Sequence, residues 1–236
     1  AAAYALVEAC LDARIPYLDL ADGSDFVAGI AAYDARAKAA GVALLSGVSS
    51  FPVLTAAVMR ALGDGMAEIE TVHGGVAPSP FAGVGLNVIR AIASYAGRPV
   101  RVRRNGTDTT GYPFTSQRRV TIAPPGRLPL RSTLFSLIDV PDLTALPAWR
   151  PELKTVWMGA GPVPSVLHRL LIAAAWLVRL RLLPSLSFLA RPMFAAINLL
   201  RWGEHRGGMF VAIAGRGAAG EPVARSWHML AEGDHG

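Results

Sequence analysis

The sequence is poor in cysteine and in charge. Cys10 is the only cysteine among the 236 residues, which excludes a disulfide framework and a cysteine metal site within the chain. Charged residues make up only 17% of the sequence, against 52% apolar residues, and this balance is too hydrophobic for a disordered chain. The length suits one large domain or two modest ones. A lone cysteine is compatible with a reducing, cytoplasmic compartment.

Familiar catalytic motifs are also missing. No Gly-x-Ser-x-Gly occurs, which disfavours an α/β-type hydrolase, and the five histidines share no metal-ligand spacing with carboxylates, so we expect no metal. No Gly-x-Gly-x-x-Gly turn leads from a buried strand into a helix, and Gly83-Val-Gly85 follows a proline-rich loop. The sequence opens at Ala1 as if in mid-helix, without a basic and apolar leader. We therefore expect a fragment that is cut at both ends.

Long charge-free runs are absent from the most apolar segment, 165–202. Its uncharged stretches, such as Leu170 to Val178, are far shorter than the roughly 20 residues of a membrane span. Arginines recur along it, and Pro184 and Pro192 interrupt it. Two interpretations remain open: core helices whose arginines reach the surface, or an interfacial hairpin at the inner membrane, with Trp176 and Trp202 in the lipid. The arginines concerned are Arg169, Arg179, Arg181, Arg191 and Arg201.

Basic residues are concentrated in one stretch. The formal net charge is +6, and residues 98–131 contain many arginines but only one acidic residue, Asp108. Such a stretch suits phosphate or an acidic lipid surface. It lacks the interleaved aromatic residues and the helix-turn-helix pattern of nucleic-acid binders, so we expect no nucleic-acid partner. Arg127 and Arg131 are candidates for binding a substrate carboxylate or phosphate, and a solvated basic strand is the alternative.

The first 64 residues alternate between helices and strands. Apolar spacing predicts helices over 2–13, 25–40 and 52–62, and two apolar runs predict buried strands at 15–20 and 42–46. This alternation is typical of a parallel sheet, so we expect the two strands to be adjacent and parallel. Ligands bind at the carboxyl ends of such strands. The polar or small residues at those ends are Asp19, which can also cap the next helix, and Ser46, Gly47 and Ser49.

From residue 65 onward the pattern favours an α+β domain. A helix is predicted at 84–96, and Asn105-Gly106 is a strong hairpin signal. His73, at the end of the first strand, is a candidate general acid, and a solvated loop histidine is the alternative. The predicted strands lie at 68–76, 100–103, 118–122, 131–138, 154–159, 208–214 and 222–230.

A series of short segments, in this order along nearly the whole chain, resembles the saccharopine dehydrogenase-like family. In that family an Ala-Cys helix leads to a Tyr-Leu/Val-Asp strand, and a Gly-x-x-x-x-Pro turn opens the next helix. The family includes saccharopine reductases and trans-acting enoyl reductases of lipid biosynthesis. The matching segments are Tyr4 to Cys10, Tyr17 to Leu20, Ser46 to Pro52, Gly97 to Pro99, Pro125 to Arg127, Asp139 to Pro147, Gly207 to Met209 and Ser226-Trp227.

The resemblance implies part of a Rossmann-type NAD(P)-binding domain in 1–64, with Asp19, Ser46, Gly47 and Ser49 facing the cofactor. It implies a substrate and dimerisation domain in 65–236, and an NAD- or NADP-dependent oxidoreductase acting on an amino-acid or lipid-like substrate. The family's pyrophosphate-binding turn would lie upstream of Ala1, so we expect weak or absent NAD(P)H binding by these residues alone. A non-catalytic or membrane-surface protein that keeps the fold is the alternative hypothesis.

Overall fold

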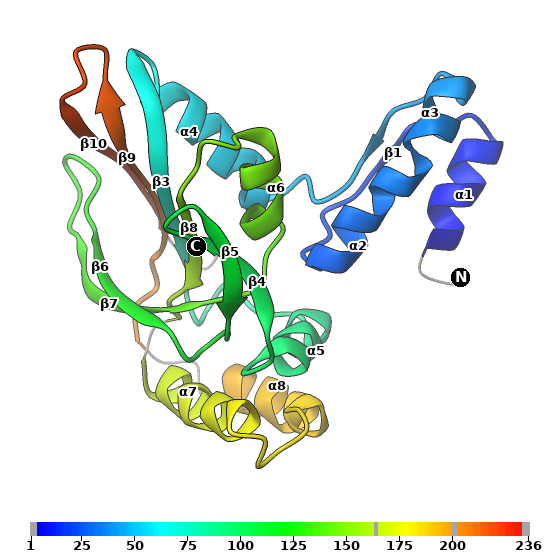
Figure 1. The fold of residues 1–236 in the computed structure, drawn as a ribbon. Helices are drawn as coiled ribbons and strands as arrows, with labels where there is room; N and C mark the ends of the chain where they lie inside the picture. Colours follow the sequence, from blue (N-terminus) through cyan, green and yellow to red (C-terminus); the bar gives the residue numbers. More distant parts are fainter. Residues whose placement is uncertain (1–3, 163–164, 200–202, 233–236) are drawn as a thin grey trace.

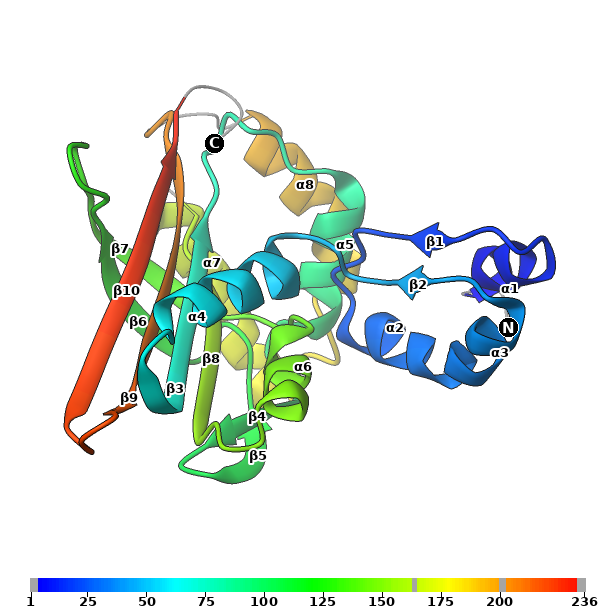
Figure 2. The same ribbon diagram turned by 90° about the horizontal axis from the view of Figure 1, so that it is seen from above.

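The computed structural model describes residues 4–162, 165–199 and 203–232. These residues form a small N-terminal unit that stands beside a larger unit built on a curled sheet (Figure 1). Seen from above, the N-terminal unit projects from the side of the larger one (Figure 2). The mixed α/β fold predicted from the sequence is confirmed.

The N-terminal unit contains two short parallel strands and the helices that pack on them. β1 (Tyr17–Leu18) pairs with β2 (Leu44–Leu45), and Tyr17 lies opposite Leu44, so the predicted adjacent parallel strands are confirmed. Gly41 ends α3 at a φ of 68°, in the left-handed region that favours glycine. The helices are α1 (Ala5–Asp12), α2 (Ser24–Gly29), a 3₁₀ turn (Ile30–Tyr33) and α3 (Asp34–Ala40).

The expectation that both strands are buried is wrong. Tyr17 and Leu44 pack against the small core of this unit, but Leu18 and Leu45 are 59% and 51% exposed on the other face. The cause is that α1, the 3₁₀ turn and α3 all contribute to one core on a single face of the strand pair, around Val7. An apolar run shows that a strand can be buried on both faces; it does not show that both faces are covered.

The larger unit is organised around a mixed sheet. Within the described residues its strand order is β10-β9-β3-β8-β7-β6, in which β3 and β8 pair in parallel and the other neighbours are antiparallel. The sheet curls until β6 approaches β10, where the backbone amide of Ala123 donates to His228 Nδ1 at 3.2 Å. The strands are β3 (Met66–Ala77), β6 (Gln117–Ile122), β7 (Leu130–Leu137), β8 (Thr155–Ala160), β9 (Gly207–Gly217) and β10 (Pro222–Ala231).

Separate elements flank the sheet. β4 (Val100–Arg104) and β5 (Thr107–Gly111) form a hairpin whose turn, Asn105-Gly106, has positive φ at both residues, so the predicted hairpin is confirmed. α4 (Thr55–Leu62) and α6 (Asp142–Trp149) lie on the side of the sheet that faces the N-terminal unit (Figure 1). α5 (Leu86–Tyr95), α7 (Ser165–Arg179) and α8 (Ala190–Leu199) lie below the sheet in the view of Figure 1.

The hydrophobic residues divide into two cores. The N-terminal core includes Leu44 as a packed neighbour, whereas Phe51 and Met59 already belong to the large core of the sheet. The cores therefore separate between β2 and the turn that precedes α4, earlier in the chain than residue 64. The domain limits 1–64 and 65–236 stay a prediction.

Segment 165–202 forms the expected pair of helices as far as it is described; Arg201 and Trp202 lie outside the described residues. α7 buries His168, Ala175 and Val178. The His168 Nε2 atom lies 2.8 Å from Ser136 Oγ on β7, which anchors the helix to the sheet. No helix within the described residues is long and apolar enough to cross a membrane.

The centre of the sheet provides a test of the fold. Phe135 is fully buried on β7 and packs edge-on against Phe210 of β9, with ring centroids 5.2 Å apart. We expect Phe135→Ala to lower the free energy of unfolding by about 3–5 kcal/mol, because the truncation removes buried surface and leaves a cavity. Urea denaturation measures the change. The control Leu128→Ala removes a side chain that is 71% exposed and is expected to change stability by less than about 0.5 kcal/mol.

Candidate functional site

The carboxyl ends of β1 and β2 hold a compact hydrogen-bond network. Asp19 Oδ1 accepts hydrogen bonds from the backbone amides of Ala21 and Gly47, both at 2.9 Å. The Ser46 hydroxyl donates to Asp19 Oδ2 at 2.8 Å. The structure thus brings together three of the four residues predicted at this edge. Ser49 turns away from the network, since its hydroxyl donates to the carbonyl of Phe51 at 2.8 Å.

This network fixes the charge of Asp19. Burial tends to raise the pKa of the carboxyl group, but hydrogen bonds from Gly47, Ala21, Tyr17 and Ser46 outweigh it and lower the pKa. Asp19 is therefore a carboxylate at neutral pH, and its oxygens hold the turn after β2 in place. Since the carboxylate is already bonded to two backbone amides and to the Ser46 hydroxyl, the network fixes the shape of this edge of the sheet.

A second group of polar residues lies where the two units meet, and we call it the junction cluster: Asp22, Ser24, Tyr95 and Asp139. The Ser24 hydroxyl at the start of α2 donates to Asp139 Oδ1 at 2.7 Å, across 115 residues of sequence. Asp22 and Asp139 both contribute negative charge that raises the pKa of Tyr95, after the larger effect of burial. The cluster therefore joins the carboxyl end of β1 to the ends of α5 and β7.

The junction cluster is suited to proton transfer. Burial raises the pKa of the Asp139 carboxyl group, although the hydrogen bond from Ser24 acts in the opposite direction. Burial also raises the pKa of Asp22, with a smaller opposing effect from the nearby Ser49. A carboxyl group with a raised pKa remains protonated at pH values closer to neutral. Tyr95, whose pKa is also raised, keeps its phenolic proton and can donate a hydrogen bond. These groups can therefore donate a proton to a reacting atom beside them.

Asp142, close in sequence to this cluster, is a buried acid that the sequence did not single out. It lies in the first turn of α6 with no exposed surface. Neither carboxyl oxygen has a hydrogen-bond partner within the described residues. Burial raises the pKa of Asp142 to about 7, with a smaller opposing effect from the nearby Thr55. The pattern Asp139-Val-Pro-Asp142, directly after a predicted strand, is the sequence signal that could have found both acids.

His73 lies elsewhere, on the face of the sheet that points away from α4. Arg118 Nη1 of β6 is 3.1 Å from both ring nitrogens of His73, and its guanidinium lies 5.1 Å from the ring centroid of Trp157. Burial, followed by the Arg118 charge, lowers the pKa of His73 to about 4. The imidazole is thus neutral at pH 7 and accepts from Arg118. The general-acid role of His73 stays a prediction that this environment does not favour.

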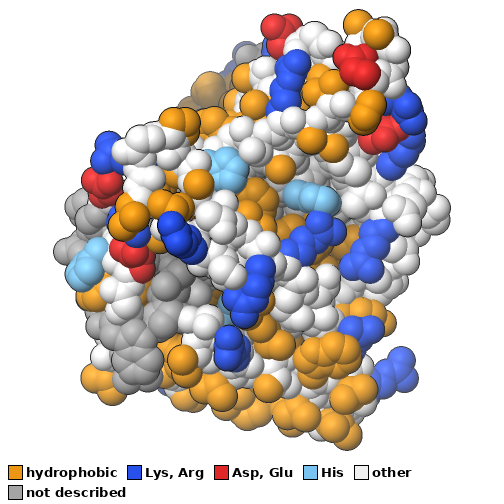
Figure 3. Space-filling view, turned by 90° about the vertical axis from the view of Figure 1, so that its left-hand side faces the viewer, with side chains coloured by type: hydrophobic (Ala, Val, Ile, Leu, Met, Phe, Trp, Pro, Cys, Tyr) orange, Lys and Arg blue, Asp and Glu red, His pale blue; other side chains and the backbone are white. Residues whose placement is uncertain are grey.

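Figure 3 views this side of the molecule, where histidine and arginine side chains surround a hollow. Arg118 forms no ion pair with a carboxylate within the described residues, and its pKa is lowered by burial and then by Arg104. Such a guanidinium suits an oxyanion. Trp157 Nε1 is buried there without a partner in the part of the chain that the structure describes.

The structure does not bring Arg127 and Arg131 to His73 or to the strand ends. Arg127 Nη1 forms an ion pair with Glu232 Oε1 at 2.7 Å, at the rim where β6 approaches β10. Arg131 lies exposed on β7. An arginine that already has a carboxylate partner is less available to a substrate, so of the two only Arg131 is exposed and without an ion pair within the described residues. Their role in substrate binding stays a prediction.

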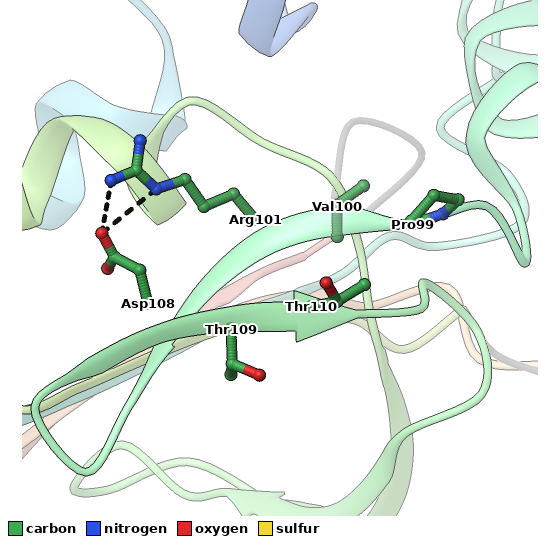
Figure 4. Close-up of a pocket in the computed structure, with 6 residues that line it drawn as sticks. All are labelled: Pro99, Val100, Arg101, Asp108, Thr109 and Thr110. Atoms are coloured by element: carbon green, nitrogen blue, oxygen red, sulfur yellow. Dashed lines mark hydrogen bonds and ion pairs between the residues drawn. The ribbon is translucent and has the colours of Figure 1, made fainter.

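A cavity of about 410 Å³ lies on the β4–β5 hairpin (Figure 4). Its charged residues, Arg101 and Asp108, form an ion pair in which Arg101 Nε is 3.2 Å from Asp108 Oδ2. Arg103 binds the same carboxylate at 2.8 Å, and the pKa of Asp108 falls to about 2 because of these hydrogen bonds. The charges in this cavity neutralise one another, and it contains none of the residues predicted to bind ligand.

The described residues contain no group of three or more histidine, cysteine or acidic residues that could hold a metal ion.

Comparison with known proteins gives a structural relative. No family model and no curated protein sequence matches the chain. Among solved structures, the fold is similar to apo saccharopine dehydrogenase (L-Glu forming) from Saccharomyces cerevisiae, with a TM-score of 0.54 and 10% identity. The similarity covers 96% of this chain and 67% of that chain. At this identity it shows a shared fold, and it supports a distant structural relationship to the family that the sequence segments resemble.

Asp142 gives a pH-dependent prediction. Its folded pKa of about 7 exceeds the unfolded value of 3.8, so the folded state holds the proton more tightly. The buried charge of ionised Asp142 therefore lowers the free energy of unfolding. This loss of stability is absent below about pH 4, grows as the pH rises and is complete above about pH 7. We expect Asp142→Asn to unfold with a higher free energy than the parent above pH 7, by up to about 4 kcal/mol, and to converge with it near pH 4.

Urea titrations of both proteins from pH 4 to pH 8 measure this difference. The exposed Asp64→Asn is the matched control, because it makes the same chemical change on the surface and is expected to alter stability by less than about 0.5 kcal/mol. A constant difference between Asp142→Asn and the parent across the pH range would refute the role assigned to burial.

Proposed function

We propose that the chain forms part of an NAD(P)-dependent oxidoreductase. The cofactor would lie along the carboxyl ends of β1 and β2, and the substrate would lie at the junction cluster. The observation that carries this proposal is the contact between Ser24 and Asp139. This contact places acids of the second unit directly beside the edge of a parallel sheet, where ligands bind in open α/β folds.

The sequence and the fold both support the proposal. The series of short sequence segments between Tyr4 and Trp227 resembles the saccharopine dehydrogenase-like family. A saccharopine dehydrogenase shares the fold over 96% of the chain. The free edge of β1 and the exposed Leu18 and Leu45 fit a sheet that continues on that side. A nucleotide-binding domain of this type has such a continuation, with strands beside β1 and helices over its second face.

The residues at the carboxyl ends of β1 and β2 suit the nicotinamide end of a dinucleotide but not its pyrophosphate. The turn after β2, with Ser46, Gly47 and Ser49, could contact the nicotinamide end. The pyrophosphate needs backbone amides at a helix N-terminus behind a glycine-rich turn. The sequence has one Gly-x-Gly-x-x-Gly, Gly215 to Gly220, but it connects β9 to β10 and opens no helix. When bound, a nicotinamide supplies or accepts a hydride.

The residues of the chain would then control the proton. In the reducing direction, a carbonyl, imine or alkene that takes up a hydride also needs a proton. Asp139, whose pKa burial raises, would donate it directly or through the Tyr95 hydroxyl. The Ser24 hydroxyl would keep the Asp139 carboxyl group oriented toward the junction. We propose an amino-acid or a lipid-like compound as the substrate.

Cofactor binding is the first test. We expect the 236-residue chain to bind NADPH and NADH with dissociation constants weaker than about 1 mM, because the anionic pyrophosphate lacks its amide donors. Expression from the complete reading frame is expected to restore micromolar binding to one of the two. Fluorescence titration of the nicotinamide measures both proteins. Micromolar binding to the 236 residues alone, or none to the complete protein, would count against the proposal.

The proton donor is the second test, made in the complete protein with the cofactor that it binds. We expect Asp139→Asn to lower the rate of NAD(P)H oxidation by about 10²-fold or more, with an unchanged cofactor dissociation constant. The substrates to be screened are 2-oxo acids with an amino acid, and enoyl thioesters. Asp64→Asn, an exposed change in the turn between α4 and β3, is the control. An Asp139→Asn enzyme with the parent rate and pH profile would exclude this acid.

A further inference from the structure

One surface of the molecule gathers large exposed apolar side chains along two helices and the connection between them. We call it the α7–α8 face. Figure 3 shows hydrophobic side chains gathered along the lower edge of the molecule, over these helices, with basic side chains between them. Its members are 39% to 83% exposed: Val166, Leu170, Trp176, Leu177, Leu180, Leu182, Phe188 and Leu199.

The periodicity of α7 shows that this exposure belongs to one continuous helix face. His168, Ala175 and Val178 point into the core, whereas Leu170 and Leu177, one heptad apart, are 63% and 42% exposed. A surface helix normally carries polar residues on its outer face. Because α7 is apolar on both faces, its outer face resembles a binding surface rather than a solvated one.

The charges on this face are all positive. The sequence contains no aspartate or glutamate between Glu152 and Glu204. Arg169, Arg181 and Arg191 are exposed and form no ion pair within the described residues. Their guanidinium groups therefore lack the acidic partners that basic residues elsewhere on the surface have, such as Asp108 on the β4–β5 hairpin.

Arg179 is held in a different way. It donates to the Thr115 hydroxyl at 3.0 Å and lies 4.5 Å from the ring centroid of Trp176 and 4.6 Å from that of Tyr112. These contacts fix the indole ring of Trp176 at the edge of the face. Tryptophan beside arginine is the composition that is typical of the boundary between lipid headgroups and acyl chains.

We propose that the α7–α8 face docks on an anionic lipid bilayer. The helices lie in the plane of the interface, with Leu170, Leu177 and Phe188 in the acyl region and the free arginines at the headgroups. A second copy of the chain is the weaker occupant, because a symmetric contact places the same surface on both sides. Arginines would then meet arginines, with no acid on the face to pair with them. This proposal does not depend on the oxidoreductase assignment.

Vesicle co-sedimentation tests the proposal on the purified 236-residue chain at low salt. We expect most of the protein to sediment with vesicles of phosphatidylglycerol and phosphatidylcholine, and little with phosphatidylcholine alone. The triple variant Arg169→Gln, Arg181→Gln and Arg191→Gln is expected to bind the anionic vesicles more weakly by about fivefold for each arginine removed. Raising the salt concentration is expected to weaken binding of the parent protein in the same direction.

A double variant, Leu170→Ser with Leu177→Ser, tests the apolar half of the face and is expected to lose sedimentation. Leu128→Ser is the matched control, since Leu128 is 71% exposed on the turn between β6 and β7, and it is expected to bind as the parent does. Thermal unfolding followed by circular dichroism shows that each variant is folded. The Trp176 emission of the parent is expected to shift to the blue on binding.

Three results would overturn the proposal. The first is absence of sedimentation with anionic vesicles at low salt. The second is an equal loss in the Leu128→Ser control, which would show that exposed leucine anywhere causes the effect. The third is a dimer in sedimentation equilibrium that the Leu170→Ser and Leu177→Ser double variant dissociates, with no vesicle binding by the parent; this result would assign the face to a second copy of the chain.

Discussion

Two adjacent glycines in β3 are the constraint on which the larger unit depends. A Cβ atom at Gly74 would lie 2.7 Å from Met158 Sδ, and one at Gly75 would lie 2.5 Å from the Phe210 ring. Side chains from β8 and β9 therefore close over both faces of the central strand, in space that any larger residue would occupy. In the ladders Gly74 lies opposite Met158 of the parallel neighbour β8, and Gly75 lies opposite Phe210 of the antiparallel neighbour β9. The two glycines thus make room for side chains of both neighbouring strands.

The sequence predicted the regular elements better than the places where they meet. β3 follows apolar alternation, β9 follows the continuous apolar run from Met209 to Ala214, and the β4–β5 turn follows from Asn105-Gly106, because these signals are local. β5 was missed since it is polar and mostly exposed. α6 was missed because it begins after Pro141 and contains Pro147, both of which normally mark helix boundaries.

The candidate site could likewise be predicted where it depends on neighbouring strands, but not where distant parts of the chain meet. The contact of Asp19 with Ser46 and Gly47 could be predicted, because parallel neighbouring strands bring their carboxyl ends to one edge. The contact between Ser24 and Asp139 could not, since it joins residues 115 positions apart in units with separate cores. The low pKa of His73 and the raised pKa of Asp142 likewise result from burial, which residue type alone does not reveal.

The junction cluster and the α7–α8 face share one support, helix α5. Its last residue, Tyr95, belongs to the cluster, and its Ala93 carbonyl accepts a hydrogen bond from Leu186 in the connection between α7 and α8. Immediately after α5 the chain reaches Gly97, at a φ of 75°, where a Cβ atom would lie 2.1 Å from the carbonyl oxygen of Ala175. Backbone rests on backbone at this point, without a compressible side chain between them. The orientation of α7 relative to the end of α5 is therefore fixed, and the outer face of α7 would meet a flat surface at one angle to α5.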